Sequence, residues 1–299
     1  MIRRAPKALF ILVDGLGIGL KDPDRNPVRY GVCPFLCGLL DGYAVPVDAS
    51  MGVPGIPQSA TGQTALFTGI NAAREVGRHV EGFPGPVLRE IIRGHNVYDI
   101  LVRRGYCCTF ANAYYLDDVE EVRHRRHQSV TTVAALKAFG TVRGRQEMLQ
   151  GRAVYQDLTR VSLRERGYDG PLTSPAQSGR DLVSIARDHD FTVFEYFQTD
   201  RVAHKGTPKD VRAILAQFDA FLREAAGFAA EDPDHLLLLT SDHGNIEEAR
   251  SPSHSINPVP LVAIGRGAEQ LRDEVHSLPD FVPSLLRLYP APGASLVAC

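Results

Sequence analysis

The sequence contains no long apolar run and no excess of charge of one sign. No stretch approaches the roughly 20 consecutive apolar residues that a membrane-spanning helix needs. Its 33 basic and 35 acidic residues give a formal net charge of -2. No overall field therefore draws the chain toward nucleic acid or an anionic membrane surface, and we expect neither as a partner.

Cysteine is also scarce, at five residues, and no two form a Cys-x-x-Cys pair. An odd number without such pairs argues against a disulfide framework and against a cysteine zinc site. We expect buried free thiols at Cys33, Cys37, Cys107, Cys108 and Cys299. The apolar run near residue 10 is short and is broken at once by Asp14 and Gly15, so it predicts a buried strand rather than a signal peptide. We accordingly expect a cytoplasmic protein.

What the sequence does contain is a set of three apolar runs that each lead to a carboxylate. They are ALFILVDG, FTVFEYFQTD and HLLLLTSDHG, and their carboxylates are Asp14, Asp200 and Asp242. Continuous apolar runs separated by helical patterns are typical of strands buried on both faces of a parallel sheet, so the fold class is α/β. Ligands of open α/β sheets bind outside the carboxyl ends of the strands, and we expect these three carboxylates to converge there.

Further patterns divide the chain into a core and an insertion. We expect helices over 96–105, 211–227 and 278–289, and strands over 106–115 and 257–265. The stretch from 114 to 180 is richer in arginine, histidine and glycine, although 129–140 is helical in pattern. We interpret 114–180 as a small cap inserted into a core that residues 1–113 and 181–299 form.

Beyond the first apolar run, the chain contains five further candidate metal ligands. Asp242 and His243 are adjacent at a strand end, and Asp200 and His204 would share one face if the chain is helical there. His254, in SPSHSINPVP, offers a third imidazole. Each of these also has an ordinary structural interpretation, as a turn residue, a helix surface pair or a loop histidine. Their occurrence together favours a metal site.

Ser59 lies in PQSATGQTALFTG, where a helical pattern opens after a proline. Its hydroxyl should therefore lie at a helix N-terminus. The structural interpretation is an N-cap serine. The functional interpretation is a nucleophile, because a helix N-terminus favours negative charge and a metal ion there would hold the serine as an alkoxide. The two interpretations are compatible.

In chain order, these pieces resemble the metalloenzyme core of the alkaline phosphatase superfamily, most closely its cofactor-independent phosphoglycerate mutase and phosphopentomutase branch. That superfamily has an early strand ending in Asp and a Ser or Thr nucleophile about ten residues before a glycine, as in Ser59 and Gly69. The mutase branch adds Asp-x-x-x-His, Asp-His-Gly-Asn and a His before Asn-Pro-Val-Pro. The resemblance covers roughly the first 75 and last 115 residues, and it implies a three-layer α/β/α core with a mostly parallel sheet.

The resemblance also implies a ligand set for two divalent metal ions, for which manganese or zinc are the best candidates. One ion would bind Asp200, His204 and His254, and the second would bind Asp14, Asp242, His243 and the Ser59 oxygen. Ser59 would be the catalytic nucleophile. Asn112, which follows an expected strand, is a candidate for contact with the substrate. The arginines and histidine of the insertion could hold the rest of the substrate or form a solvated helix face; they are Arg123, Arg125, Arg126 and His127.

Three departures from the mutases affect the expected reaction. Gln63 stands where those mutases have His, and the insertion is much smaller than their second domain. In addition, the segment at 151–160 resembles one that follows the nucleophile directly in phosphoglycerate mutase, yet here it lies in the expected cap. We predict a two-metal phosphoric ester hydrolase, of the phosphomonoesterase kind, that acts on a small phosphorylated metabolite through a phosphoserine at Ser59.

Other reactions use the same scaffold. A phosphomutase and a phosphodiesterase remain open, whereas a sulfatase is disfavoured because no cysteine stands at the nucleophile position. Outside enzymes, a catalytically silent metal-binding interaction protein would keep the scaffold without turnover. The sequence leaves the oligomeric state and the identity of the metal open.

Overall fold

The computed structural model describes residues 5–248, 251 and 253–291, and its centre is a six-stranded sheet in the order β2-β8-β7-β1-β6-β3. The strands of this sheet are β1 (Lys7–Val13), β2 (Ala44–Val47), β3 (Cys108–Phe110), β6 (Phe191–Tyr196), β7 (His235–Ser241) and β8 (Val259–Gly265). Strands β7, β1, β6 and β3 pair in parallel, while β8 is antiparallel to both of its neighbours. The mostly parallel sheet is confirmed.

Strand β1 explains why the apolar runs are continuous. Its side chains alternate between two hydrophobic clusters on opposite faces of the sheet, as the period of two in a strand requires. Ala8, Phe10 and Leu12 belong to the first cluster, and Leu9, Ile11 and Val13 belong to the second. Because helices cover both faces, neither set of side chains reaches solvent.

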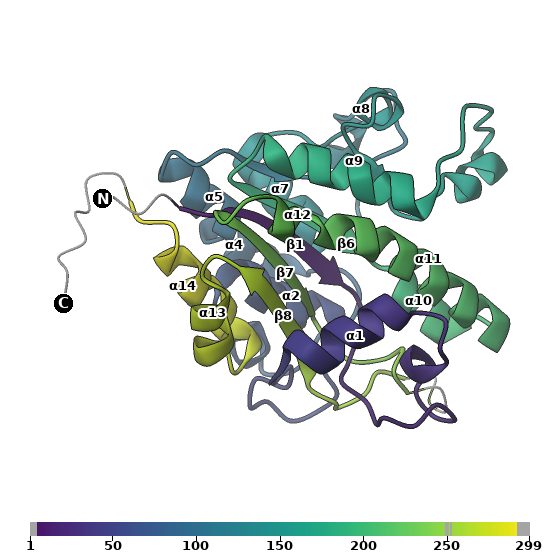
Figure 1. The fold of residues 1–299 in the computed structure, drawn as a ribbon. Helices are drawn as coiled ribbons and strands as arrows, with labels where there is room; N and C mark the ends of the chain where they lie inside the picture. Colours follow the sequence, from purple (N-terminus) through teal and green to yellow (C-terminus); the bar gives the residue numbers. More distant parts are fainter. Residues whose placement is uncertain (1–4, 249–250, 252, 292–299) are drawn as a thin grey trace.

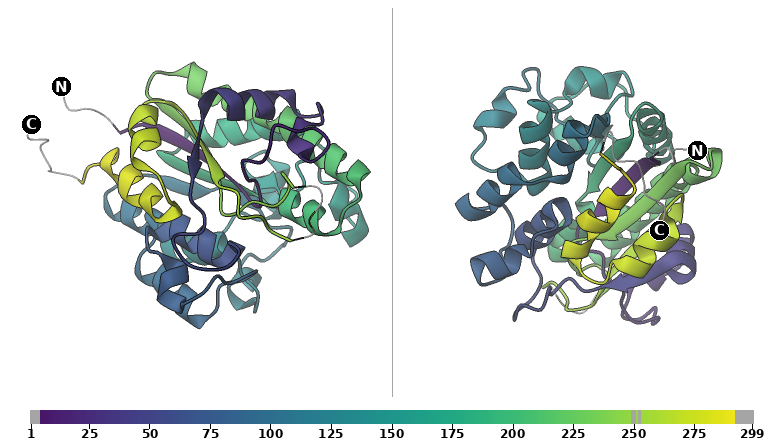
Figure 2. Two further views of the ribbon diagram at one scale, coloured as in Figure 1. Left: turned by 90° about the horizontal axis from the view of Figure 1, so that it is seen from below. Right: turned by 90° about the vertical axis from the view of Figure 1, so that its left-hand side faces the viewer.

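The helices form the two outer layers (Figure 1). The first cluster is covered by α2 (Ser59–Thr68), α4 (Pro86–Gly94), α5 (Val97–Arg103), α7 (Val130–Phe139), α13 (Ala268–Glu274) and α14 (Phe281–Arg287). The second is covered by α1 (Pro34–Tyr43), α9 (Pro175–Arg187), α10 (Gln198–Lys205), α11 (Pro208–Ala226) and α12 (Phe228–Glu231). Figure 2 shows the sheet between these layers from two further directions. The three-layer α/β/α architecture is thus confirmed.

Shorter elements connect these layers. They are η1 (Pro27–Arg29), α3 (Ala72–Val76), β4 (Asn112–Ala113), α6 (Glu121–His124), α8 (Arg145–Leu149), β5 (Val154–Tyr155), η2 (Val161–Arg166) and η3 (Leu278–Asp280). The strand expected over 106–115 is divided, because after β3 the chain leaves the main sheet and β4 pairs in parallel with β5. Strand β2 was not anticipated; it is a four-residue edge strand that contains Pro46, and proline is tolerated at such edges.

The expected insertion at 114–180 has two parts with different packing. Helix α7 contributes Val130, Val133 and Ala134 to the first cluster of the main core. The outer segment, which we define as residues 144–170, has a small hydrophobic cluster of its own that includes Met148 and Leu163. This outer segment is therefore the cap-like part, and the division at 114 and 180 stays a prediction.

Among the described residues, no helix is both long enough and apolar enough to cross a membrane. The four described cysteines are free thiols, as expected, but they are not all buried. Cys33 is buried, whereas Cys107, which directly precedes β3, is exposed. Cys299 lies outside the described residues.

Candidate metal centre

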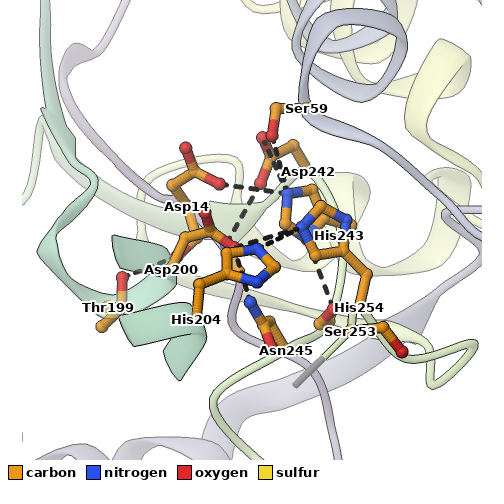
Figure 3. A network of polar contacts seen from close by, with 12 residues as sticks. Asp14, Ser59, Thr199, Asp200, His204, Asp242, His243, Asn245, Ser253 and His254 are labelled. Carbon is orange, nitrogen blue, oxygen red and sulfur yellow. Dashed lines mark hydrogen bonds and ion pairs between the residues drawn. The ribbon is translucent and has the colours of Figure 1, made fainter. Parts of the chain in front are cut away.

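Three neighbouring parallel strands carry the carboxylates to one edge of the sheet. Asp14 directly follows β1, Asp242 directly follows β7, and Asp200 lies in the first turn of α10 after β6. Strand β1 pairs with both β6 and β7, so the three carboxyl ends are adjacent. The expected convergence is observed (Figure 3).

The first group of donors surrounds the buried ring of His243. Its Nε2 lies 3.1 Å from Oδ1 of Asp14 and 3.8 Å from Oδ2 of Asp242. The same Nε2 is 2.9 Å from Oγ of Ser59. Asp14, Asp242 and His243 place one ligand atom each within 4.8 Å of one another. A carboxylate, a second carboxylate and an imidazole are donors that borderline divalent metals accept.

The second group surrounds Asp200. Residues 198–205 are helical, so Asp200 and His204 share a face, and His204 Nε2 lies 3.3 Å from Asp200 Oδ1. His254 Nε2 lies 3.3 Å from the same carboxylate oxygen and 2.9 Å from His204 Nε2. Asn245, of the Asp-His-Gly-Asn sequence, orients this carboxylate by donating its Nδ2 hydrogen to Oδ1 at 2.7 Å.

Two observations on hydrogen bonding fit a cation in this space. Nδ1 of His254 lies 3.0 Å from the carbonyl oxygen of Pro57 and must donate to it, so Nε2, which faces Asp200, is the ring atom that can bind a cation in place of a proton. Oδ1 of Asp14 is a buried oxygen whose near neighbour is Nε2 of His243, at 3.1 Å. An imidazole oriented by a backbone carbonyl and a buried carboxylate oxygen are suited to binding a divalent ion.

The grouping of ligands differs in one respect from the set that the resemblance implies. His243 belongs to both groups of donors, one with Asp14 and Asp242 and one with Asp200 and His254. Its ring stacks on that of His254, with centroids 3.7 Å apart and an interplanar angle of 12°. The division of ligands between two ions stays a prediction. Because His243 lies between the two groups, replacing this residue tests the division most directly.

Electrostatics at this edge of the sheet favour positive charge. Burial raises the pKa of Asp14 well above its ordinary value, and the nearby charge of Asp242 raises it further. Burial alone would lower the pKa of His243, but Asp242 and Asp14 raise it to about 10. Burial also opposes ionisation of Asp200, yet the hydrogen bond from His254 and the charge of His243 lower its pKa to about 2. The carboxylates thus stabilise a proton on His243 where no ion is bound.

Ser59 is the first residue of α2, and its N-cap is Gln58, so the N-cap interpretation of Ser59 is wrong. Its Oγ points toward His243 rather than back to the helix amides (Figure 3). The ten-residue spacing from Ser59 to Gly69 is the length of this helix, because Gly69 ends it in the left-handed conformation at φ 72°. Residues between them are buried, so α2 is a rigid support for the serine.

Helix α2 also packs directly against the strand end that carries Asp242. Gln63 donates its Nε2 hydrogen to Oδ2 of Asp242 at 3.0 Å. At the preceding residue, a Cβ added at Gly62 would overlap the backbone carbonyl oxygen of Asp242. The glycine in Ser-Ala-Thr-Gly-Gln is therefore explained by the close approach of a helix to a backbone.

We expect Gly62→Ala to push α2 away from Asp242 and to reduce both metal content and folded yield. Gly38→Ala is the matched control, because Gly38 is also helical and an added Cβ there meets nothing within 4 Å. The control should gain roughly 0.5–1 kcal/mol of stability from the better helix propensity of alanine. Elemental analysis and urea unfolding of both variants test this prediction, and a Gly62→Ala protein with full metal content would contradict it.

Two buried glutamates were missed by the sequence prediction. Glu247 is 1% exposed, and its Oε2 accepts hydrogen bonds of 2.8 Å from the backbone amides of Gly17 and Asn245. Its Oε1 accepts from Ser255 and from Asn257. It therefore ties together three loops that carry Asp14, His243 and His254. The sequence offered no signal for this role, because these donors come from distant segments.

The second buried glutamate is Glu195. The sequence does contain a signal for it, because it is a charged residue inside the apolar run of β6. Its carboxylate is 5% exposed and accepts a hydrogen bond from Thr131 at 2.5 Å. Burial raises its pKa to about 7, although the bonds from Thr131 and Gln63 oppose that rise. Gln63 thus donates to two buried carboxylates, Asp242 and Glu195.

The raised pKa of Glu195 predicts how stability depends on pH in the metal-free protein. A carboxyl whose pKa rises from 4.5 to about 7 on folding contributes stability below pH 4.5 and loses it as the pH rises through 7. That difference corresponds to about 3 kcal/mol at most. We expect Glu195→Gln to remove the loss, so that the variant gains stability relative to the wild type between pH 5 and pH 8. Urea unfolding of both proteins in chelator at pH 5 and pH 8 measures this. The prediction is refuted if the difference in unfolding free energy between variant and wild type is the same at both pH values.

The candidate substrate contacts occupy different positions. Asn112 lines the cavity described below, but its amide group is paired with the backbone of Glu195 in both directions, at 2.7 and 2.8 Å. Its contact with substrate stays a prediction. Of the four basic residues, Arg125 and His127 line the same cavity, whereas Arg123 is paired with Glu120. The structure does not place Arg123 or Arg126 in the lining.

Solved structures share this architecture. Phosphoglycerate mutase of Leishmania mexicana superposes with a TM-score of 0.62 at 11% identity, over 97% of this chain and 97% of that one. Alkaline phosphatase from the Antarctic bacterium TAB5 gives a TM-score of 0.58 at 13% identity, over 96% and 99% of the two chains. At such identities the likeness shows the fold. The chain shares the fold of these two enzymes, and its two groups of carboxylates and imidazoles could hold metal ions.

Sequence comparison places the chain in a family. The metalloenzyme superfamily model matches residues 6–288, so the chain belongs to the metalloenzyme superfamily. Among relatives, the 2,3-bisphosphoglycerate-independent phosphoglycerate mutase of Acetivibrio thermocellus is 32% identical over 107 residues, which are 33% of this chain and 20% of the mutase. That of Coxiella burnetii is 32% identical over 127 residues, 40% of this chain and 24% of the mutase. The matched part is thus a quarter or less of each relative.

Proposed function

We propose that the chain is a two-metal phosphoric ester hydrolase that acts through a covalent phosphoserine at Ser59. The observation that carries this proposal is the position of Ser59 Oγ, at the N-terminus of α2, 2.9 Å from His243 Nε2 and in the same cavity wall as Asp14 and Asp200. A nucleophile beside two groups of metal ligands is the arrangement that phosphoryl transfer requires.

Asp14, Asp242 and His243 would hold one ion with the serine oxygen, and Asp200, His204 and His254 would hold the other, with His243 in reach of both ions. When bound, such ions keep the serine oxygen ionised and neutralise the phosphoryl oxygens. Manganese and zinc both suit mixed carboxylate and imidazole ligands. The chain supplies the rest: α2 fixes Oγ in place, and its N-terminus favours the negative charge of the reacting group.

The proposed reaction has two displacements at phosphorus. Ser59 Oγ forms a bond to phosphorus while the bond to the ester oxygen breaks, and the alcohol leaves with a proton. Water then bonds to phosphorus, the Oγ–phosphorus bond breaks, and inorganic phosphate leaves. The substrate we propose is a small phosphorylated metabolite of the cytoplasm.

A phosphomutase is the second candidate, and the names of the relatives favour it. In that reaction the substrate would turn within the site and take the phosphoryl group back from Ser59, which requires exclusion of water. The relatives are several times longer than their matched parts, and the outer segment of this chain is short. We therefore favour hydrolysis.

We expect the metal-loaded protein to release one phosphate per molecule of phosphomonoester consumed, without forming an isomer. The test incubates the protein with 3-phosphoglycerate, ribose 5-phosphate and p-nitrophenyl phosphate, and measures free phosphate and isomerised products together. Isomer formation without phosphate would establish the mutase instead. Metal binding with neither product would favour the catalytically silent alternative.

A further inference from the structure

The cavity at the candidate metal centre is larger than a phosphoryl group needs, and its wall changes character along its length. Its volume is about 460 Å³, which lies in the range of sites that enclose whole small organic ligands, about 300–1,000 Å³. Asp14, Ser59 and Asp200 line one end. The remainder of the wall must therefore contact the part of the substrate that does not react.

Aromatic side chains from separate segments form much of that remainder. Phe83 precedes α4, Tyr115 follows β4, Tyr155 ends β5, and Phe197 follows β6. Phe83 is 52% exposed, and its ring centroid lies 5.2 Å from that of His127. Aromatic walls bind flat rings well, because they bury area and stack at low entropic cost.

The basic side chains of the wall, apart from Arg201 beside Asp200 in α10, come from segments away from the metal centre. The lining carboxylates are Asp14, Glu195 and Asp200, all at or next to the metal centre. The other charged or titratable lining residues, tyrosines apart, are basic: Arg125, His127, Arg166 and Arg201. Arg125 and His127 follow α6, and Arg166 ends η2 in the outer segment.

These basic groups have few partners of their own. Among the described residues, neither Arg125 nor Arg166 forms an ion pair, and the Arg166 guanidinium lies 5.7 Å from the ring centroid of Tyr115. Arg145 lies over the same ring at 5.3 Å but is paired with Asp117. Unpaired arginines beside aromatic rings suit an anion carried by a ring-containing ligand.

We infer that the substrate is a phosphomonoester whose alcohol part contains a flat ring and a second anionic group, as in a nucleoside bisphosphate. This inference rests on the proposed function, because it assigns the reacting phosphoryl group to the Ser59 end. The ring would lie against Phe83 and Tyr155, and the second anion would lie between Arg125 and Arg166. A three-carbon phosphate would leave both parts of the wall without a partner.

Four compounds separate the two features in the metal-loaded protein. Glycerol 3-phosphate has neither, 3-phosphoglycerate has the second anion, adenosine 5′-monophosphate has the ring, and adenosine 3′,5′-bisphosphate has both. We expect kcat/KM to rise about tenfold for each feature and about a hundredfold for both together. If neither feature raises kcat/KM by more than about threefold while glycerol 3-phosphate is hydrolysed, the substrate inference is wrong and the proposed function stands.

Variants assign each feature to its part of the wall. Phe83→Ala should lower kcat/KM for the two adenosine compounds at least fivefold more than for glycerol 3-phosphate. Arg166→Gln should lower kcat/KM for adenosine 3′,5′-bisphosphate at least fivefold more than for adenosine 5′-monophosphate. Leu20→Ala and Arg93→Gln are matched controls, because both side chains are exposed and lie outside the cavity lining. Equal effects on all four compounds would overturn the assignment.

Binding distinguishes failure of this inference from failure of the proposed function. Calorimetry with metal-loaded Ser59→Ala should give at least tenfold tighter binding of adenosine 3′,5′-bisphosphate than of 3-phosphoglycerate. If the wild type turns over none of the four compounds but this preference is found, only the proposed hydrolysis is wrong. If binding is equal, the substrate inference is wrong whatever the turnover.

Discussion

Replacing Ser59 by alanine is expected to lower phosphate release by about three orders of magnitude or more, while most of the bound metal is retained. The reason is that Oγ, which this change removes, lies 2.9 Å from His243 Nε2, whereas the remaining candidate ligand atoms belong to other side chains. The measurements are kcat/KM on p-nitrophenyl phosphate and elemental analysis of the same sample.

Ser50→Ala provides the control for this change, since Ser50 lies in a turn outside the cavity lining. Acid-quench of the wild type with a phosphorus-labelled substrate should also trap label on the protein, and Ser59→Ala should trap none. Unchanged turnover in Ser59→Ala would show that another group attacks phosphorus.

His243→Ala is expected to remove both ions, because His243 contributes to both groups of donors. Metal content after dialysis should fall to less than about a tenth of the wild-type value, since loss of a ligand weakens binding more than the 10–100-fold typical of loss of a ligand's supporting partner. His204 and Asp200 lie in α10, and His204→Ala changes only the second group, so it should retain one ion.

The ratio of metal to protein in the two variants decides how the ligands are divided. If His243→Ala retains one ion, His243 serves only the ion bound with Asp14 and Asp242, as the resemblance implies. His95→Ala is the control for loss of an exposed histidine away from the site. Circular dichroism of the metal-free variants separates loss of ligand from loss of fold, because His243 is fully buried.

The sheet and the convergence of the candidate metal ligands could both be predicted from the sequence, and for the same physical reason. Strands buried on both faces must be apolar throughout, so β1, β6 and β7 are visible as continuous runs. A polar residue at the end of such a run is conspicuous, as at Asp14 and Asp242. Helical spacing likewise predicted the shared face of Asp200 and His204, since an i,i+4 pair is a local property.

Properties that depend on contacts between distant segments were not accessible in this way. Glu247 receives hydrogen bonds from loops more than 200 residues apart in the chain. Helix α7, in a region expected to be an insertion, packs against α4 and α5 and adds Val130 and Val133 to the main core, and the pattern alone does not locate these contacts. Gly69 was enough to predict where α2 ends. Its start was less accessible, because Gln58 rather than Ser59 occupies the N-cap position that serine favours.

The four hydrogen bonds that Glu247 accepts also bear on how the protein takes up metal. They join the loops after β1 and β7 to the loop before β8 through protein atoms alone. Because these bonds do not involve a cation, we expect the ligand-bearing loops to keep their arrangement without one, unlike a zinc finger, which folds only when it binds its ion. Uptake and release of metal should proceed without unfolding, which allows the occupancy of the centre to follow the free metal concentration around it.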